Sequence, residues 1–230
     1  QHAGVVGGIE RMGLQQGDIM WGPLPMFHTA FIQPLTGILY VGGTYLSMTH
    51  FDAEVALEMI RREGATLMFP AFPTITMQLL NHAAYSERSF SAVRAVLNVG
   101  PPAELRAMQK RMPHTVQITV FGMTETGGSA AMCELKDTLK LRSDCSGRAL
   151  PGNQIEIRDP DTGMAIQPGS IGEIVVRGRG VFAGYFNAPQ KTVESFYEGG
   201  WFRTGDLGSV DAQGRVTFRG RLKDMLKVGG

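Results

Sequence analysis

The apolar positions in the first half of the chain follow two periodicities in turn. The helical spacing predicts helices over residues 53–62, 73–82 and 102–112. Short apolar runs predict buried strands over residues 66–69, 93–99 and 116–121. Asp52 is a candidate N-cap for the first helix, and Gly64 is its candidate stop. Strands that alternate with helices in this way indicate a mostly parallel sheet with helices on its faces.

The pattern changes after about Gly147, where the apolar runs shorten and turn residues multiply. Strands are predicted over residues 153–158, 172–177, 207–210 and 215–219, with one short helix over 190–196. The last two strands flank D-A-Q-G, which is typical of a hairpin turn. We therefore expect an α/β part over residues 1–146 and a small antiparallel, barrel-like part over 147–221, with the boundary near 143–152.

Composition narrows the possible partners and the compartment. The 230-residue chain is 43% hydrophobic and 19% charged, which is typical of a globular protein. Its formal net charge is +1 and it has no dense Lys/Arg cluster, so nucleic acid is not an expected partner. Its most apolar part, residues 27–46, is interrupted by Pro34 and predicts a buried helix plus strand, with no membrane span. Two cysteines, Cys133 and Cys145, without zinc spacing or a signal peptide, favour a cytoplasmic location.

The stretch V-F-G-M-T-E-T-G-G, residues 120–128, combines glycines and threonine hydroxyls but lacks a lysine. Glycines let backbone N–H groups approach a phosphate, whereas a glutamate repels one unless a divalent cation lies between them. Mg²⁺ prefers a few carboxylates together with phosphate oxygens. Thr124 is therefore a candidate phosphate contact and Glu125 a candidate metal ligand. An ordinary strand-to-helix turn with an exposed glutamate explains this stretch alone equally well.

Two later stretches carry further candidate chemistry. In G-G-W-F-R-T-G-D-L-G, residues 199–208, Asp206 could accept hydrogen bonds from both hydroxyls of a ribose, or it could cap an Asx turn. In G-R-L-K-D-M-L-K-V-G-G, residues 220–230, cations lie beside a double glycine. A solvated basic segment is the alternative for this second stretch.

Taken together, six stretches resemble motifs of the adenylate-forming superfamily in their order and spacing. This superfamily contains acyl-CoA synthetases, luciferases and the adenylation domains of peptide synthetases. The stretches are P-L-P-M-F-H, N-V-G-P-P-A-E, F-G-M-T-E-T-G, G-E-I-V-V-R-G with G-Y-F-N, G-W-F-R-T-G-D and G-R-L-K-D-M-L-K-V-G-G. Any one of them alone would be a weak signal, but six in order over most of the chain form a strong one. The resemblance implies part of an acyl-CoA synthetase-like N-terminal domain.

The resemblance also implies a role for individual residues. Thr124 would contact the α-phosphate of ATP, Glu125 would bind Mg²⁺, and Asp206 would hold the ribose with Arg221 reaching the same sugar. His28 would line the entry between the acyl and CoA sites, although a lone histidine in an apolar stretch is more often a packed core residue. Phe121 would stack on the adenine, and Gly100 and Pro101 would border it. Gly122 and Met123 are the remaining nucleotide-binding positions. Lys223 and Asp224 would form the hinge, residues 222–230, to a C-terminal domain.

Two parts of the superfamily pattern are missing from these residues. Nothing before Pro23 matches its Ser/Thr/Gly-rich phosphate loop with a lysine, and its catalytic lysine lies in a domain that would follow Gly230. We therefore expect the chain to be the later part of a large N-terminal domain that ends just past the hinge. We also expect little or no synthetase activity from it alone.

The resemblance implies ATP-dependent conversion of a carboxylic acid to acyl-AMP, followed by thioester formation with CoA. P-M-F-H-T-A-F contains no acidic residue that could pair with the ammonium of an amino acid, so we expect a fatty or other apolar acid. Aryl and dicarboxylic acids are the alternatives. The candidate acid-site residues are Phe31, Ile32, Met123 and Met132. Rival functions are acyl-AMP transfer to a carrier protein, a luciferase-like oxidation, a non-catalytic nucleotide-binding relative and a purely structural domain.

Overall fold

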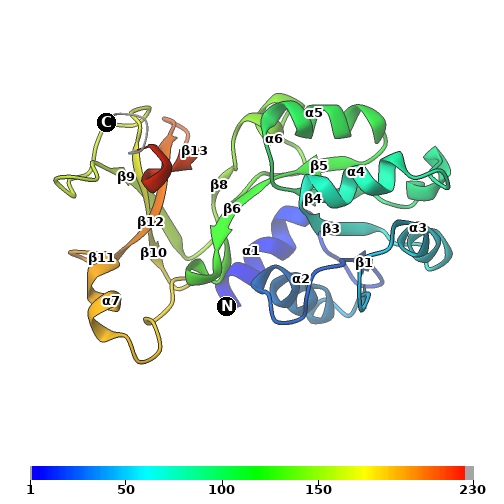
Figure 1. Ribbon diagram of the computed structural model, residues 1–230, viewed down its shortest axis with the longest axis horizontal. Helices are drawn as coiled ribbons and strands as arrows, with labels where there is room; N and C mark the ends of the chain where they lie inside the picture. Colours follow the sequence, from blue (N-terminus) through cyan, green and yellow to red (C-terminus); the bar gives the residue numbers. More distant parts are fainter. Residues whose placement is uncertain (1, 226–230) are drawn as a thin grey trace.

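A computed structural model describes residues 2–225, and within them a five-stranded parallel sheet forms the centre of the first part (Figure 1). The order across this sheet is β2-β1-β3-β4-β5, and all neighbouring strands are parallel. Its strands are β1 (Ile19–Trp21), β2 (Thr44–Leu46), β3 (Leu67–Ala71), β4 (Ala95–Asn98) and β5 (Val116–Ile118). The expected parallel α/β part is confirmed.

Helices cover both faces of the parallel sheet, because successive residues of a strand point to opposite faces. Met20 packs in the core below α1 and α2, while its neighbour Trp21 packs in the core beneath α3, α4 and α5. Figure 1 shows these two groups of helices on opposite sides of the strands. The helices are α1 (His2–Met12), α2 (Thr29–Tyr40), α3 (Ala53–Arg62), α4 (Pro73–Asn81), α5 (Pro102–Arg111) and a short α6 (Leu139–Asp144).

Helix α3 illustrates how local sequence sets an element. The Asp52 carboxylate accepts a hydrogen bond from the backbone N–H of Val55 at 2.9 Å, and Gly64 ends the helical segment in a left-handed conformation with φ +64°. One face of the helix is buried through Ala56, Leu57 and Ile60. The predicted cap, stop and helix are therefore confirmed. Helix α1 and strand β1, by contrast, were not predicted from the pattern.

The second part contains an antiparallel sheet, which lies at the left of Figure 1. Strand β12 forms its centre: one edge pairs with β10, and the other pairs with β11 and then β13. The D-A-Q-G turn joins β12 to β13, as predicted, with Gly214 in a left-handed conformation. The elements are β9 (Asn153–Arg158), β10 (Gly172–Gly178), α7 (Pro189–Glu194), β11 (Phe196–Tyr197), β12 (Trp201–Val210), β13 (Val216–Arg221) and α8 (Leu222–Met225).

A third, antiparallel sheet lies between the two larger ones. The prediction of one continuous strand over residues 116–121 is therefore corrected. That stretch divides into β5 and β6 (Val120–Met123), which belong to different sheets. The division falls at Thr119, whose carbonyl accepts a hydrogen bond from Cys133 N at 3.1 Å, so pairing passes from the parallel sheet to a hairpin. The hairpin continues through a 3₁₀ turn (Thr124–Thr126) into β7 (Gly128–Met132), which pairs with β8 (Arg148–Ala149). The alternative strand-to-helix turn is therefore wrong.

None of the helices in the described part of the chain has the length and apolar character needed to cross a bilayer. The apolar region 27–46 instead supplies helix α2 and strand β2, as its pattern predicts. Helix α2 contains Pro34 and packs Phe31 and Ile38 into the core beside α1.

We expect Gly122→Ala to destabilise the fold by about 1–3 kcal/mol, because a Cβ at this position would overlap the Gly128 carbonyl and the Ser129 backbone across the hairpin. Urea denaturation of the two proteins measures the difference. Gly8→Ala in α1 is the matched control, since an added Cβ there meets nothing within 4 Å and alanine favours helices. Equal effects of the two substitutions would contradict the steric argument.

Candidate active site

A cavity of about 800 Å³ lies where the ends of β3 and β4 meet the β6–β7 hairpin and the β12–β13 pair. Ligands of α/β sheets commonly bind beyond the carboxyl ends of the strands. Residues predicted to bind nucleotide, metal or acid come together on its wall from distant parts of the sequence. They are His28, Gly100, Pro101, Phe121, Gly122, Met123, Thr124, Glu125, Asp206 and Arg221.

The hairpin loop presents Thr124 to the cavity because Thr126 closes the turn behind it. The hydroxyl of Thr126 accepts a hydrogen bond from Met123 N at 3.0 Å, and its side chain is buried. Gly127 then takes a left-handed conformation with φ +71°, which reverses the chain into β7. Thr124 itself is exposed on the cavity wall. This loop can therefore offer a hydroxyl and backbone groups to an oxyanion.

Glu125 is half-buried beside Thr124 and is held by a loop from the second part. The Tyr185 hydroxyl donates a hydrogen bond to Glu125 Oε1 at 2.9 Å, and Phe182 N donates to the Glu125 carbonyl at 2.8 Å. Among residues 2–225 the other carboxylate oxygen, Oε2, accepts no hydrogen bond. One oxygen of this carboxylate thus remains available to a cation or a water molecule.

Asp206 is 4% exposed, yet its carboxylate lines the cavity. Its Oδ1 lies 2.9 Å from Arg221 Nε, but the two groups are not aligned for a hydrogen bond, and Oδ1 makes none among the described residues. Burial raises the pKa of Asp206 to about 6, while Arg221 lowers this pKa and Glu173 raises it further. A buried acceptor without a donor fits a ligand that brings hydroxyl groups.

Glu173 is a residue that the sequence reasoning missed. It is 1% exposed, and its carboxylate accepts hydrogen bonds from Gly205 N at 3.1 Å and from the Tyr197 hydroxyl at 2.8 Å. Arg203 Nε lies 3.4 Å from the same carboxylate. Glu173 thereby holds the irregular part of β12 directly before Asp206, where Gly205 takes a left-handed conformation. The available signal was a carboxylate directly before the apolar run I-V-V in G-E-I-V-V-R-G.

His28 and Phe121 differ from their simplest sequence interpretations. His28 is exposed, lines the cavity and caps helix α2, with its Nδ1 accepting from Ala30 N at 3.0 Å, so the packed-core alternative is wrong. Phe121 is largely buried and its ring stacks on Phe218, with 6.5 Å between the centroids. Phe218 is 46% exposed and also lines the cavity, although no motif pointed to it.

The apolar wall of the cavity also differs from the expected acid site. Met123 lines the cavity, but Phe31 and Met132 are buried in the core below α1 and α2, and Ile32 packs against that core. Helical periodicity turns Phe31 toward Tyr45, with 5.1 Å between their ring centroids. The apolar side chains that line the cavity instead include Ala30, Phe69, Ala71, Phe72, Leu97 and Val99.

The predicted hinge residues lie outside the cavity wall. Lys223 and Asp224 are exposed in the short helix α8, directly after Arg221. Lys227, the third cation of the predicted basic segment, lies outside the described residues, as does the double glycine.

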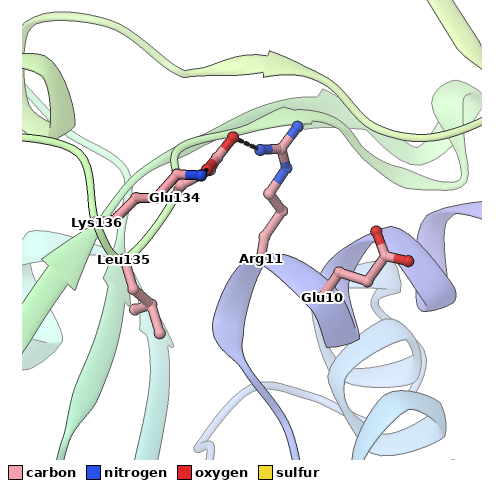
Figure 2. Close-up of a pocket in the computed structure, with 5 residues that line it drawn as sticks. All are labelled: Glu10, Arg11, Glu134, Leu135 and Lys136. Carbon is pink, nitrogen blue, oxygen red and sulfur yellow. Dashed lines mark hydrogen bonds and ion pairs between the residues drawn. The ribbon is translucent and has the colours of Figure 1, made fainter.

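A second cavity of about 460 Å³ contains none of the predicted site residues (Figure 2). Glu134 forms ion pairs there with Arg11 and with Lys136, whose Nζ lies 2.9 Å from Glu134 Oε2. Its hydrogen bond with Lys136 lowers the pKa of Glu134. Because these charges satisfy one another, Glu134 links α1 to the segment after β7 and is not itself an unpaired carboxylate.

A family model described as AMP-binding enzyme matches residues 1–186. The chain belongs to this family. The resemblance carried by the motifs is thereby confirmed, and so is the fold that it implied.

Two curated AMP-binding relatives act on different acids, according to their names. The chain is 32% identical over 225 residues to 4-coumarate–CoA ligase 1 of Oryza sativa subsp. japonica, which covers 95% of this chain and 40% of that protein. It is 33% identical over 221 residues to the mitochondrial medium-chain acyl-CoA ligase ACSF2 of Rattus norvegicus, which covers 90% of this chain and 34% of that protein. The chain thus spans less than half the length of these relatives.

Among solved structures of this kind, O-succinylbenzoate coenzyme A synthetase from Bacillus subtilis, in complex with ATP and a magnesium ion, matches with a TM-score of 0.84. The two chains are 25% identical, and the match covers 97% of this chain and 46% of the other. The parallel sheet and the antiparallel sheet both fall within the matched region, so the whole described fold has a counterpart in this structure.

Proposed function

We propose that the full-length protein is an acid–thiol ligase, which uses ATP to convert a carboxylic acid to acyl-AMP and then transfers the acyl group to CoA. The single observation that carries this proposal is the cavity, because it joins a hydroxyl, a carboxylate with one oxygen that accepts no hydrogen bond, and a buried carboxylate that is ion-paired but accepts no hydrogen bond at Oδ1. These groups are Thr124, Glu125 and Asp206. The names of the two curated relatives, both acid–CoA ligases, support the same reaction class.

The nucleoside would bind between Asp206 and the segment that begins α5. Asp206 Oδ1 has no hydrogen bond among the described residues and could accept from a ribose hydroxyl. Arg221 lies beside it and is exposed enough to reach the same sugar. Gly100, Pro101 and Phe121 line the cavity, and we propose that they border the adenine.

Glu125 and its surroundings fit a magnesium ion that is shared with a nucleotide. In the described part of the chain, no group of three or more His, Cys, Asp or Glu residues could hold a metal ion by protein ligands alone. Mg²⁺ commonly takes one or two carboxylates and completes its shell with phosphate oxygens and water. When bound, it would neutralise charge on the phosphates as the acid carboxylate approaches. Thr124 would contribute a neutral contact to the same phosphate.

The acid that we propose is apolar, either fatty or aryl. The cavity wall supplied by α2, β3, β4 and the residues after them is mainly aromatic and aliphatic, with Thr29 and Gln33 as polar members, and it has no charged side chain among the described residues. An ammonium group would have no partner on this wall, and its burial would be costly. This wall therefore favours an acid without an amino group. The cytoplasmic location stays a prediction, and one relative is named as mitochondrial.

We expect the full-length protein to catalyse exchange of pyrophosphate into ATP with a medium-chain fatty acid or a hydroxycinnamic acid. Addition of CoA should then give the corresponding thioester, which mass spectrometry detects. Exchange with an amino acid alone would overturn the apolar assignment, and transfer only to a carrier protein would favour an acyl-AMP ligase. ATP binding without exchange for any acid would favour a non-catalytic nucleotide-binding relative, and no binding of ATP at all would leave a purely structural domain.

Residues 1–230 by themselves should show little exchange. They contain no Ser/Thr/Gly-rich loop with a lysine before Pro23, and no lysine lines the cavity in the described part of the chain. Cationic groups placed beside the reacting phosphate commonly contribute strongly to this kind of reaction. Robust exchange by the isolated chain would contradict this expectation.

A further inference from the structure

The second half of the motif G-E-I-V-V-R-G with G-Y-F-N lies against the Thr-Glu loop. The segment after β10 approaches so closely that a Cβ at Gly127 would meet the Gly180 carbonyl at 2.9 Å. Phe182 N also donates a hydrogen bond to the Glu125 carbonyl at 2.8 Å. The two loops therefore meet through their backbones, which fixes the distance between Tyr185 and Glu125.

The position of Tyr185 is determined from several directions. Its backbone N–H donates to Thr192 Oγ1 at 2.9 Å, and its ring packs edge-on against Phe182, with 4.8 Å between the centroids. The Nζ of Lys191 lies 4.0 Å from the centroid of the Tyr185 ring. A ring held by α7 on one side and by the preceding loop on the other has little freedom to swing. Its hydroxyl therefore has a nearly fixed location, 2.9 Å from Glu125 Oε1.

We propose that Tyr185 is a positioning residue for Glu125: its hydroxyl holds Oε1 and so leaves Oε2 directed to a divalent cation in the cavity. The inference rests on the proposed role of Glu125 as a metal ligand. A free glutamate carboxylate can rotate and offer either oxygen, whereas a hydrogen bond to one oxygen selects a single orientation. Hydrogen-bond partners of metal ligands commonly change metal affinity by roughly 10- to 100-fold when removed.

Tyr185→Phe isolates this function, because it deletes only the hydroxyl. The ring contact with Phe182 and the cation above the ring both remain possible for phenylalanine. Tyr85→Phe is the matched control, since the Tyr85 hydroxyl also donates a single hydrogen bond, to the Arg111 carbonyl at 3.0 Å, and Tyr85 does not line the cavity. A merely structural contribution of Tyr185 would lower thermal stability and metal-free nucleotide binding together.

The experiment measures how much Mn²⁺ strengthens binding of a non-hydrolysable ATP analogue to the full-length protein, using titration calorimetry with and without the metal. Tyr185→Phe should reduce the Mn²⁺-dependent gain in affinity by roughly 10-fold or more. The affinity of Tyr185→Phe for AMP without metal should stay within about twofold of the parent. For Tyr85→Phe, both this affinity and the Mn²⁺-dependent gain should stay within about twofold of the parent.

Glu125→Gln separates the two ways in which this inference can fail. If Glu125→Gln keeps the full Mn²⁺-dependent gain, the proposed cation site at Glu125 is itself wrong. If Glu125→Gln loses the gain while Tyr185→Phe keeps it, only the positioning role of Tyr185 is overturned. Equal losses of AMP binding and of the Mn²⁺-dependent gain in Tyr185→Phe would also overturn it, because they would indicate a general effect on the fold.

Discussion

Replacement of Glu125 by glutamine should slow adenylation by the full-length protein roughly 100- to 1,000-fold, with little change in its free energy of unfolding. The amide has almost the shape of the carboxylate and can still accept the hydrogen bond from Tyr185 through its oxygen. It has no negative charge, however, so a divalent cation would lose its protein ligand. Because Glu125 is only half-buried, the charge that is removed is not one on which the core depends.

The measurement is the rate of pyrophosphate exchange at saturating ATP and Mg²⁺, together with urea denaturation of both proteins. Glu156→Gln is the matched control: it removes a half-buried carboxylate that pairs with Arg158, on a strand that does not line the cavity in the described part of the chain. A rate of pyrophosphate exchange in Glu125→Gln equal to that of the parent would contradict the proposed role of Glu125 as a metal ligand. A large loss of stability in Glu125→Gln would show that the carboxylate mainly supports the fold.

Replacement of Asp206 by asparagine should weaken nucleoside binding by roughly 10- to 100-fold and at the same time stabilise the folded protein at neutral pH. The binding loss follows if Oδ1 accepts from a ribose hydroxyl, since a charged acceptor forms the stronger hydrogen bond. The gain in stability follows from burial, which raises the pKa of Asp206 from 3.8 to about 6. That shift corresponds to a cost on the order of 1–3 kcal/mol for holding the ionised carboxylate in the fold.

The sign of this effect predicts a characteristic pH dependence. The folded-state pKa of Asp206 lies above the ordinary 3.8. The contribution of Asp206 to stability is therefore greatest below pH 3.8 and is lost as the pH rises through about 6. Asp206→Asn should therefore be more stable than the parent at pH 8 and nearly equal to it at pH 4. Removal of the carboxylate leaves Arg221 without its partner at little cost, since that side chain is 58% exposed.

Denaturation at pH 4 and pH 8 tests the stability, and titration with adenosine tests the binding. Adenosine is the appropriate probe because it has no phosphate that titrates near pH 6. Affinity of the parent for adenosine should fall as pH drops through about 6, where the Asp206 carboxylate is protonated, and Asp206→Asn should lack this step. A parent affinity that is flat between pH 5 and pH 8 would contradict the assignment of the ribose to Asp206.

Local sequence was sufficient wherever an element depends on contacts within itself. The cap at Asp52, the buried stripe of α3 and the turn between β12 and β13 follow from periodicity and from short hydrogen bonds along the chain. The motifs also predicted the site, because they place the candidate nucleotide-binding and metal-binding residues beyond strand ends or in tight turns. The positions that the motifs assigned to nucleotide and metal therefore line a single cavity, while those of the proposed hinge lie beside it.

Prediction from local sequence failed where contacts with distant segments decide the pairing of a strand or the direction of a side chain. The apolar run 116–121 has one continuous pattern, yet pairing of its second half with β7 transfers it to another sheet. Phe31 and Met132 have the chemistry expected of an acid site, but their direction is decided by the helix and strand packed against them. Periodicity states which face is apolar, and it does not state which apolar face meets the core and which meets a cavity.

The sequence by itself determined the class of fold, the main helices and strands, and the chemical groups available for binding a nucleotide. The tertiary structure alone decided that Glu173 holds the backbone of Gly205 beside Asp206, and that Tyr185 reaches Glu125 across the boundary between the two parts of the chain. The reason is the range of the interactions. Propensities and caps act over a few residues, whereas a hydrogen bond between positions 60 residues apart exists only when the whole chain brings the two side chains together.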